Sequence, residues 1–224
     1  ATASHLAQMQ QQQKPFFSVV FTSSNHTPFE FPDGRISLFE QPKATMNNAV
    51  KYADYALGQF IAHARQQPYW HNTLFVIVAD HDNRVYGNNL VPVDKFHIPA
   101  LILGADLTPK RIKPVASQID LAPTLLSLMG ISANTPLVGR DFSRDANSPG
   151  RALMQFDQYF ALMEQQQVTI LRPGQSAVAG YYHPEQKQLQ LALQAPDSQQ
   201  VQRALAQVLL PSYLYRQQKY HARR

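Results

Sequence analysis

The sequence contains no cysteine among its 224 residues. This absence excludes a disulfide framework, a cysteine-rich zinc site and a cysteine nucleophile. No apolar run approaches the ~20 residues that a bilayer-spanning helix needs, and no signal peptide is visible at the start. The opening "ATASHLAQMQQQQKP" is typical of the polar end of a longer helix, so we expect the sequence to be part of a longer protein.

Charged residues are few, and the balance is basic. There are 20 Lys and Arg against 15 Asp and Glu, which gives a formal net charge of +5. Such a balance is compatible with phosphate-bearing partners such as lipid head groups, and equally with no special partner. No stretch interleaves basic and aromatic residues, so no nucleic-acid surface is predicted. A hydrophobic content of 44% is enough for a core in one domain, with or without a small appendage.

Three continuous apolar runs predict strands that are buried on both faces, namely "FFSVVF" (16–21), "TLFVIVA" (73–79) and "IPALILG" (98–104). Apolar residues at spacings of three and four predict a helix over 43–66. "SQIDLAPTLLSLMG" predicts a second helix over 117–130, which Asp120 would cap. Strands that alternate with helices favour an α/β fold with a mostly parallel sheet and helices on both faces.

The pattern changes after a loop-like stretch at 134–150. "QVTILR", "SAVAGYYH" and "KQLQLALQ" predict short antiparallel strands, and a closing helix follows them. We therefore expect two parts. Residues 1–145 belong to the α/β domain, and residues 146–224 form a small carboxyl-terminal α+β subdomain.

Polar side chains follow two of the predicted strands directly. His26 lies shortly after the first strand, and Asp80 and His81 lie just after the second. Ligands of an open parallel sheet bind beyond the carboxyl ends of its strands, so we expect these clusters to share one edge. Within a strand, Asp80 and His81 would point to opposite faces. Both can reach one ion only where the backbone leaves the strand, after Ala79.

A carboxylate and a neutral imidazole form a donor set that suits manganese or zinc. Asp80 and His81 cannot hold a metal alone, so at least one or two more ligands are needed. From spacing alone, an Asp80 that caps a turn beside an ordinary loop histidine remains the alternative. His26 could hold or protonate a substrate oxygen, and Arg84 could bind an anionic group. Both could equally be solvated loop residues.

Four stretches occur in an order that resembles a known family: "SSNHTPFEFP", "IVADHDNRVYG", "DKFHIPALILG" and "SQIDLAPTLLSLMGI". Together they are similar to the carboxyl-terminal half of the sulfatase-like domain in the alkaline phosphatase superfamily. The likeness is greatest to the lipoteichoic acid synthase and phosphoglycerol transferase branch. It covers residues 14–145 well and the rest more loosely.

The resemblance implies transfer or hydrolysis of phosphoryl or sulfuryl groups with a divalent metal and a covalent intermediate. It implies that Asp80 and His81 are metal ligands, for manganese in the first place, with zinc or magnesium as alternatives. His26 would contact the phosphoglycerol group. The nucleophile and a glutamate ligand belong to the amino-terminal half of such domains. No catalytic residue can therefore be assigned in this chain, and we expect the isolated chain to be inactive.

The leading hypothesis is a phosphoglycerol or related phosphoryl-group transferase that acts on membrane lipid or envelope glycan. The resemblance implies an extracytoplasmic domain of an inner-membrane protein, and the charge pattern predicts no nucleic-acid partner. Many sulfatases continue the Asp-His pair with Gly, where this sequence has Asp82. The alternatives are a sulfatase or phosphodiesterase of the same fold, and a catalytically silent module that binds lipid or a partner protein.

Overall fold

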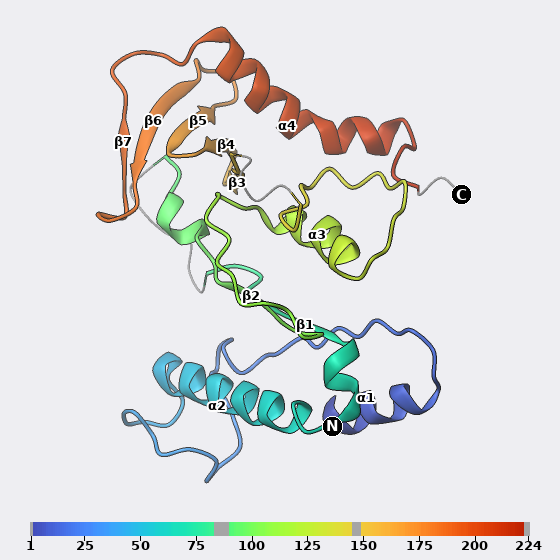
Figure 1. Ribbon diagram of the computed structural model, residues 1–224. Helices are drawn as coiled ribbons and strands as arrows, with labels where there is room; N and C mark the ends of the chain where they lie inside the picture. The colour runs from blue at the N-terminus through green and yellow to red at the C-terminus, as the bar shows by residue number, and fades with distance from the viewer. Residues whose placement is uncertain (1, 83–89, 145–148, 222–224) are drawn as a thin grey trace. The chain divides into compact units, whose positions relative to one another are not determined.

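The computed structural model describes residues 2–82, 90–144 and 149–221. The chain divides into two compact units (Figure 1): the first comprises residues 1–78 and 100–108, the second residues 79–99 and 109–224. The domain boundary predicted between residues 145 and 146 lies outside the described residues and stays a prediction.

The first unit contains the helix predicted over 43–66, observed as α2, Met46–Ala64. Thr45 begins this helix, because its side chain accepts a hydrogen bond from the Asn48 backbone N–H. Asn48 is fully buried. Its Oδ1 accepts from Phe39 N at 2.6 Å, and its Nδ2 donates to Glu40 O at 2.8 Å. One amide side chain therefore fixes the loop that leads into α2.

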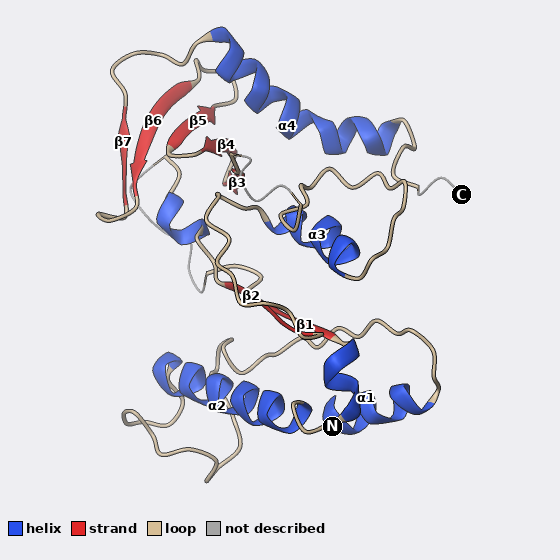
Figure 2. Ribbon diagram, viewed as in Figure 1, coloured by secondary structure: helices blue, strands red, loops and turns tan. Residues whose placement is uncertain are grey.

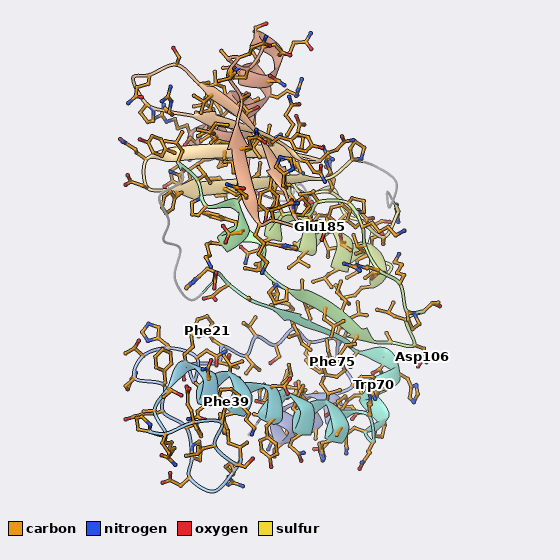
Figure 3. All side chains as sticks on the ribbon, turned by 90° about the vertical axis from the view of Figure 1, so that its left-hand side faces the viewer. Phe21, Phe39, Trp70, Phe75, Asp106 and Glu185 are labelled. Atoms are coloured by element: carbon orange, nitrogen blue, oxygen red, sulfur yellow. The ribbon has the colours of Figure 1, made fainter. Side chains whose placement is uncertain are left out.

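The core of the first unit joins α1 (Thr2–Gln11), α2, the 3-10 helix η1 (Pro68–Asn72) and strand β1 (Leu74–Val78). Its buried residues are Leu6, Ala64, Tyr69 and Phe75. Trp70 stacks on Phe75 with ring centroids 5.2 Å apart. Figure 3 labels both residues. The aromatic rings therefore hold η1 and β1 together.

Strand β1 pairs with β2 (Ala100–Gly104) in an antiparallel register, with Leu74 opposite Gly104 and Val78 opposite Ala100. Both sheets of the described structure are antiparallel throughout, so the mostly parallel sheet predicted from the sequence is not confirmed. The reason lies in the connection. A parallel pair needs a crossover, usually an α-helix, whereas the described part of 79–99 contains only the 3-10 helix η2, Val93–Phe96.

The apolar run at 16–21 forms no strand with any other described segment. Its side chains are largely exposed, with Phe17 at 86% and Phe21 at 81% of full exposure. The buried strand predicted here is therefore wrong as regards burial and pairing among the described residues.

The second unit contains a five-stranded meander in which each strand pairs with the next (Figure 2): β3 (Arg151–Phe156), β4 (Tyr159–Glu164), β5 (Gln167–Leu171), β6 (Val178–His183) and β7 (Gln188–Leu191). The antiparallel unit predicted from "QVTILR", "SAVAGYYH" and "KQLQLALQ" is confirmed as β5, β6 and β7. The closing helix is α4, Ser198–Arg216, which packs on β4 and β5. No described helix combines the length and apolar character needed to cross a membrane.

The predicted helix over 117–130 is split into the 3-10 helix η3 (Gln118–Asp120) and α3 (Leu121–Leu128). Asp120 does not cap α3 with its side chain. Instead, Ser117 begins η3, and the Asp120 carboxylate accepts from the Ser117 backbone N–H at 2.8 Å. The Asp120 carboxylate therefore stabilises the start of η3, and not the start of α3 as the sequence pattern indicated.

Candidate functional site

The candidate site lies where strand β1 ends. After Val78 the chain makes one more ladder-like contact, from Ala79 N to Pro99 O at 3.3 Å, and then turns away. Asp80 and His81 follow at once, and both are exposed. The backbone thus leaves the strand at the point where two adjacent side chains can turn toward the same place.

Both carboxylate oxygens of Asp80 face His81. Oδ1 accepts from the His81 backbone N–H at 2.9 Å, and Oδ2 lies 3.4 Å from His81 Nε2. The other ring nitrogen, Nδ1, lies 2.6 Å from Asp82 O. Because a carbonyl oxygen only accepts, this contact requires a proton on Nδ1, which makes Nε2 the ring nitrogen that can bind an ion. A backbone carbonyl on the far nitrogen is also the usual support of a metal-binding histidine.

The distance between Asp80 Oδ2 and His81 Nε2 fits two ligands of one ion. Two ligands that each lie about 2.1 Å from a tetrahedral ion are about 3.4 Å apart. Within residues 2–82, 90–144 and 149–221, however, no group of three or more His, Asp or Glu side chains could hold a metal. The pair supplies two donors, Asp80 Oδ2 and His81 Nε2, while Asp80 Oδ1 stabilises the turn.

The loop after His81 is anchored at its far end in the second unit. Val91 and Val93 are buried in the core of the five-stranded sheet, together with residues such as Met154 and Ile170. Just after them in the chain, Lys95 Nζ lies 3.8 Å from Asp82 Oδ2. The carboxyl-terminal sheet therefore positions one end of the loop that carries Asp80 and His81.

Gln118 holds the other end of this loop. Its Nε2 donates to Ala79 O at 2.9 Å and to Asp80 O at 2.8 Å. These carbonyls follow the last residue of β1, so the amide side chain supplies donors where the strand ladder stops. Gln118 comes from η3, some forty residues further along the chain.

A buried ion pair supports η3 from the other side. Asp120 and Arg151 are almost fully buried, and Arg151 Nη1 lies 3.4 Å from Asp120 Oδ1. The same Oδ1 accepts from Arg140 N at 2.7 Å. Ser117 Oγ donates to Arg151 O at 2.9 Å and accepts from Leu153 N at 3.2 Å. Strand β3 and the loop at 140 thus fix η3, which carries Gln118.

The other two predicted site residues are not brought to this pair by any described contact. His26 belongs to the first unit, where its Nδ1 lies 2.8 Å from Thr27 O. Asp80 and His81 belong to the second unit. Arg84 lies outside the described residues. The substrate-binding roles of His26 and Arg84 therefore stay predictions.

Gln118 and Lys95 were missed by the sequence reasoning. The signal for Lys95 was its place in "DKFHIPALILG", just before a predicted strand. Gln118 offered no signal beyond standing next to Ser117 in a helix start, because its contact to Asp80 spans 38 positions.

Two titratable groups of the second unit are shifted by their surroundings. Burial raises the pKa of the Tyr182 phenol, and the negative charge of Asp94 raises it further. Burial also acts to raise the pKa of the Asp141 carboxyl. Hydrogen bonds from Ser143 and Ser127, together with the charge of Arg144, outweigh this and leave that pKa below its ordinary value.

Comparison with known proteins was made by family, by sequence and by structure. A family model described as Sulfatase matches residues 2–131. The lipoteichoic acid synthase-like protein YvgJ of Bacillus subtilis is 28% identical over 143 residues, which cover 53% of this chain and 23% of that protein. Phosphoglycerol transferase I of Xanthomonas axonopodis pv. citri is 29% identical over 145 residues, which cover 58% of this chain and 19% of that protein. The chain thus spans about a quarter or less of these relatives.

Solved structures agree with the sequence matches. A protein in the alkaline phosphatase superfamily from Vibrio parahaemolyticus is 42% identical, with a TM-score of 0.89 over 98% of this chain and 54% of that one. A structure described as Ps i-CgsB shares the fold, with a TM-score of 0.62 at 18% identity over 97% of this chain and 53% of that one. The chain belongs to the sulfatase family of the alkaline phosphatase superfamily, in the branch of the lipoteichoic acid synthases and phosphoglycerol transferases.

Proposed function

We propose that this chain is part of a metal-dependent transferase that moves a phosphoglycerol or related phosphoryl group onto membrane lipid or envelope glycan. The names of its relatives, a lipoteichoic acid synthase-like protein and a phosphoglycerol transferase, support this chemistry. The proposal includes an extracytoplasmic location at the inner membrane. The net charge of +5 is compatible with a substrate that carries phosphate.

The observation that carries the proposal is the convergence of Asp80 Oδ2 and His81 Nε2 at 3.4 Å, with Nδ1 supported by Asp82 O. These two atoms would hold the cation, manganese in the first place and zinc or magnesium as alternatives. When bound, a divalent cation lowers the pKa of a nucleophile and neutralises charge on a transferring phosphoryl group. The contribution of this chain is to present one carboxylate oxygen and one imidazole nitrogen side by side.

His26 and Arg84 would bind oxygens of the phosphoglycerol group. His26 is exposed, and its Nδ1 is engaged by Thr27 O, which leaves Nε2 to face a ligand. Arg84 would contribute a planar guanidinium that matches a phosphate. The nucleophile and the remaining metal ligands would come from the part of the domain that this chain does not match. We therefore expect residues 1–224 alone to be inactive and to bind metal weakly.

The test uses the full-length native protein with Asp80→Ala and His81→Ala. Each change removes one ligand, so we expect loss of transferase activity and a fall of more than about 100-fold in Mn²⁺ affinity. This fall is larger than the one expected when a residue that only supports a ligand is replaced. Isothermal titration with Mn²⁺ and product analysis measure the two effects. Mn²⁺ affinity that stays at the wild-type value in either variant would refute the metal assignment.

The chain offers a matched control. His71 and Asp106 form another exposed His–Asp pair, with Nδ1 and Oδ1 3.0 Å apart. His71→Ala and Asp106→Ala remove the same side-chain types from the first unit. Both should keep wild-type activity and Mn²⁺ affinity.

The match to the Sulfatase family model also favours a second candidate, a sulfatase or phosphodiesterase that hydrolyses its substrate. Product analysis separates the two. A transferase yields a phosphoglycerol-modified acceptor when lipid or glycan is present. Under the same conditions a phosphodiesterase releases a phosphate monoester such as glycerol phosphate, and a sulfatase releases sulfate.

A further inference from the structure

We infer that Gln118 is a positioning residue for Asp80 and His81, an inference that rests on the proposed metal-binding role of that pair. The Gln118 amide carries two N–H donors. Its Nε2 lies 2.9 Å from Ala79 O and 2.8 Å from Asp80 O. Two donors therefore meet two acceptors, and the donor capacity of the side chain is used in full.

The two acceptors have a special relation to Asp80. Ala79 O belongs to the peptide group before the Asp80 Cα, and Asp80 O belongs to the peptide group after it. The orientations of these two groups define the φ and ψ angles of Asp80, the only soft backbone torsions of a residue. By holding both carbonyls, Gln118 fixes the direction of the Asp80 Cβ. It also fixes the peptide from which His81 extends.

Gln118 is itself held in place on both sides along the chain. Ser117 Oγ donates to Arg151 O at 2.9 Å and accepts from Leu153 N, which ties it to strand β3. Asp120 accepts from Ser117 N and Arg140 N, and it pairs with the buried Arg151. The exposed amide of Gln118 therefore projects from a rigid turn, so its contact with the carbonyls can define a geometry.

Asp80 and His81 on the one hand, and Gln118 on the other, therefore have different roles. Asp80 and His81 supply the donor atoms, 3.4 Å apart. Gln118 supplies the backbone orientation that keeps them together. Without the amide, both carbonyls would turn to solvent, and the Oδ2–Nε2 spacing would be set by the loop alone. Residues that support metal ligands in this way usually change affinity by about 10- to 100-fold.

The test is Gln118→Met in the full-length native protein, since methionine keeps the length of the side chain and removes both donors. We expect Mn²⁺ affinity to fall about 10- to 100-fold and the electron paramagnetic resonance spectrum of bound Mn²⁺ to change. Without metal, amide hydrogen exchange should speed up in a peptide that spans residues 79–82. The thermal midpoint should change little, because Gln118 is exposed.

Gln155→Met is the matched control. Gln155 Nε2 also donates to a backbone carbonyl, Asp157 O at 2.9 Å, but in the β3–β4 hairpin. It should leave affinity, spectrum and exchange at 79–82 as in the wild type.

Wild-type Mn²⁺ affinity and spectrum in Gln118→Met would overturn the positioning role, whether or not exchange at 79–82 speeds up. A failure of the proposed function looks different. In that case Asp80→Ala itself would bind Mn²⁺ normally, and the inference would fall together with the metal site.

Discussion

The two units of the chain bury their apolar residues to different extents. In the second unit, the meander and its neighbours enclose a core in which Val168, Ile170 and Ala161 are completely buried. In the first unit, the core around Phe75 is small, and the apolar run at 16–21 leaves Phe17 and Phe21 mostly exposed. The difference shows that an apolar stretch such as β5 can be buried in a core and stabilise the fold, while the similar stretch at 16–21 lies exposed on the first unit.

A single tryptophan makes it possible to follow the unfolding of the two units separately. This residue, Trp70, lies in the first unit and packs on Phe75. Tryptophan fluorescence therefore reports the first unit. Circular dichroism of the strands is dominated by the second unit, which contains five of the seven strands that the structure describes. Urea unfolding followed with both signals can assign a destabilising change to one unit.

The largest expected effect comes from Arg151→Met. This change leaves the Asp120 carboxylate buried without its charged partner, and breaking a buried pair in this way costs about 3–5 kcal/mol. The circular dichroism transition should move to lower urea, while the Trp70 fluorescence transition stays in place. The double variant Asp120→Asn, Arg151→Met removes both charges and should recover part of the loss. Equal shifts of both signals would show that the two units unfold as one.

The next effect compares one apolar residue from each unit. Ile170→Ala opens a cavity in the sheet core and should lower the free energy of unfolding by about 2–5 kcal/mol. Phe21→Ala removes a larger side chain from an exposed position and should change it by less than about 0.5 kcal/mol. Urea unfolding of the 224-residue chain measures both. A Phe21→Ala loss as large as that of Ile170→Ala would mean that this ring is buried in solution.

Local patterns predicted helix α2 and the strand positions of β1 and β2 well. The α2 stripe and the Thr45 cap act within a few residues of each other. Strand orientation depends instead on the connection, and the described part of the long loop between β1 and β2 contains no crossover α-helix. Apolar runs predict burial without identifying what covers them. The prediction for 16–21 failed because no described segment pairs with this run and its side chains are largely exposed.

Strands β3 and β4 show another limit of sequence reasoning. "RALMQF" and "YFALME" are rich in Ala, Leu, Met and Glu, which favour helices when considered alone. They form strands because their alternate residues, such as Met154 and Ala161, are buried in the shared core. The candidate site also depends on contacts between residues that are distant in the sequence. The adjacency of Asp80 and His81 is visible in the sequence, whereas the support from Gln118 exists only after folding.

The smallest expected effect concerns a carboxylate at the edge of α3, in the unit whose core is closed. Asp141 Oδ1 accepts from Ser143 N at 2.8 Å and from Ser143 Oγ at 2.5 Å. Because these bonds keep its pKa below the ordinary value, the ionised form stabilises the fold. This contribution is complete above the unfolded-state pKa of about 3.9 and is lost as the pH falls through the lower pKa of the folded state.

Asp141→Asn should therefore cost about 1 kcal/mol at neutral pH, the value of one hydrogen bond. The difference from the wild type should shrink as the pH falls below about 4. Urea unfolding from pH 7 to pH 3, followed by circular dichroism, measures this. Glu185→Gln removes an exposed carboxylate from the β6–β7 turn of the same unit (Figure 3) and controls for the loss of one negative charge. A difference between Asp141→Asn and wild type that stays constant down to pH 3 would show that shape, and not ionisation, links Asp141 to Ser143.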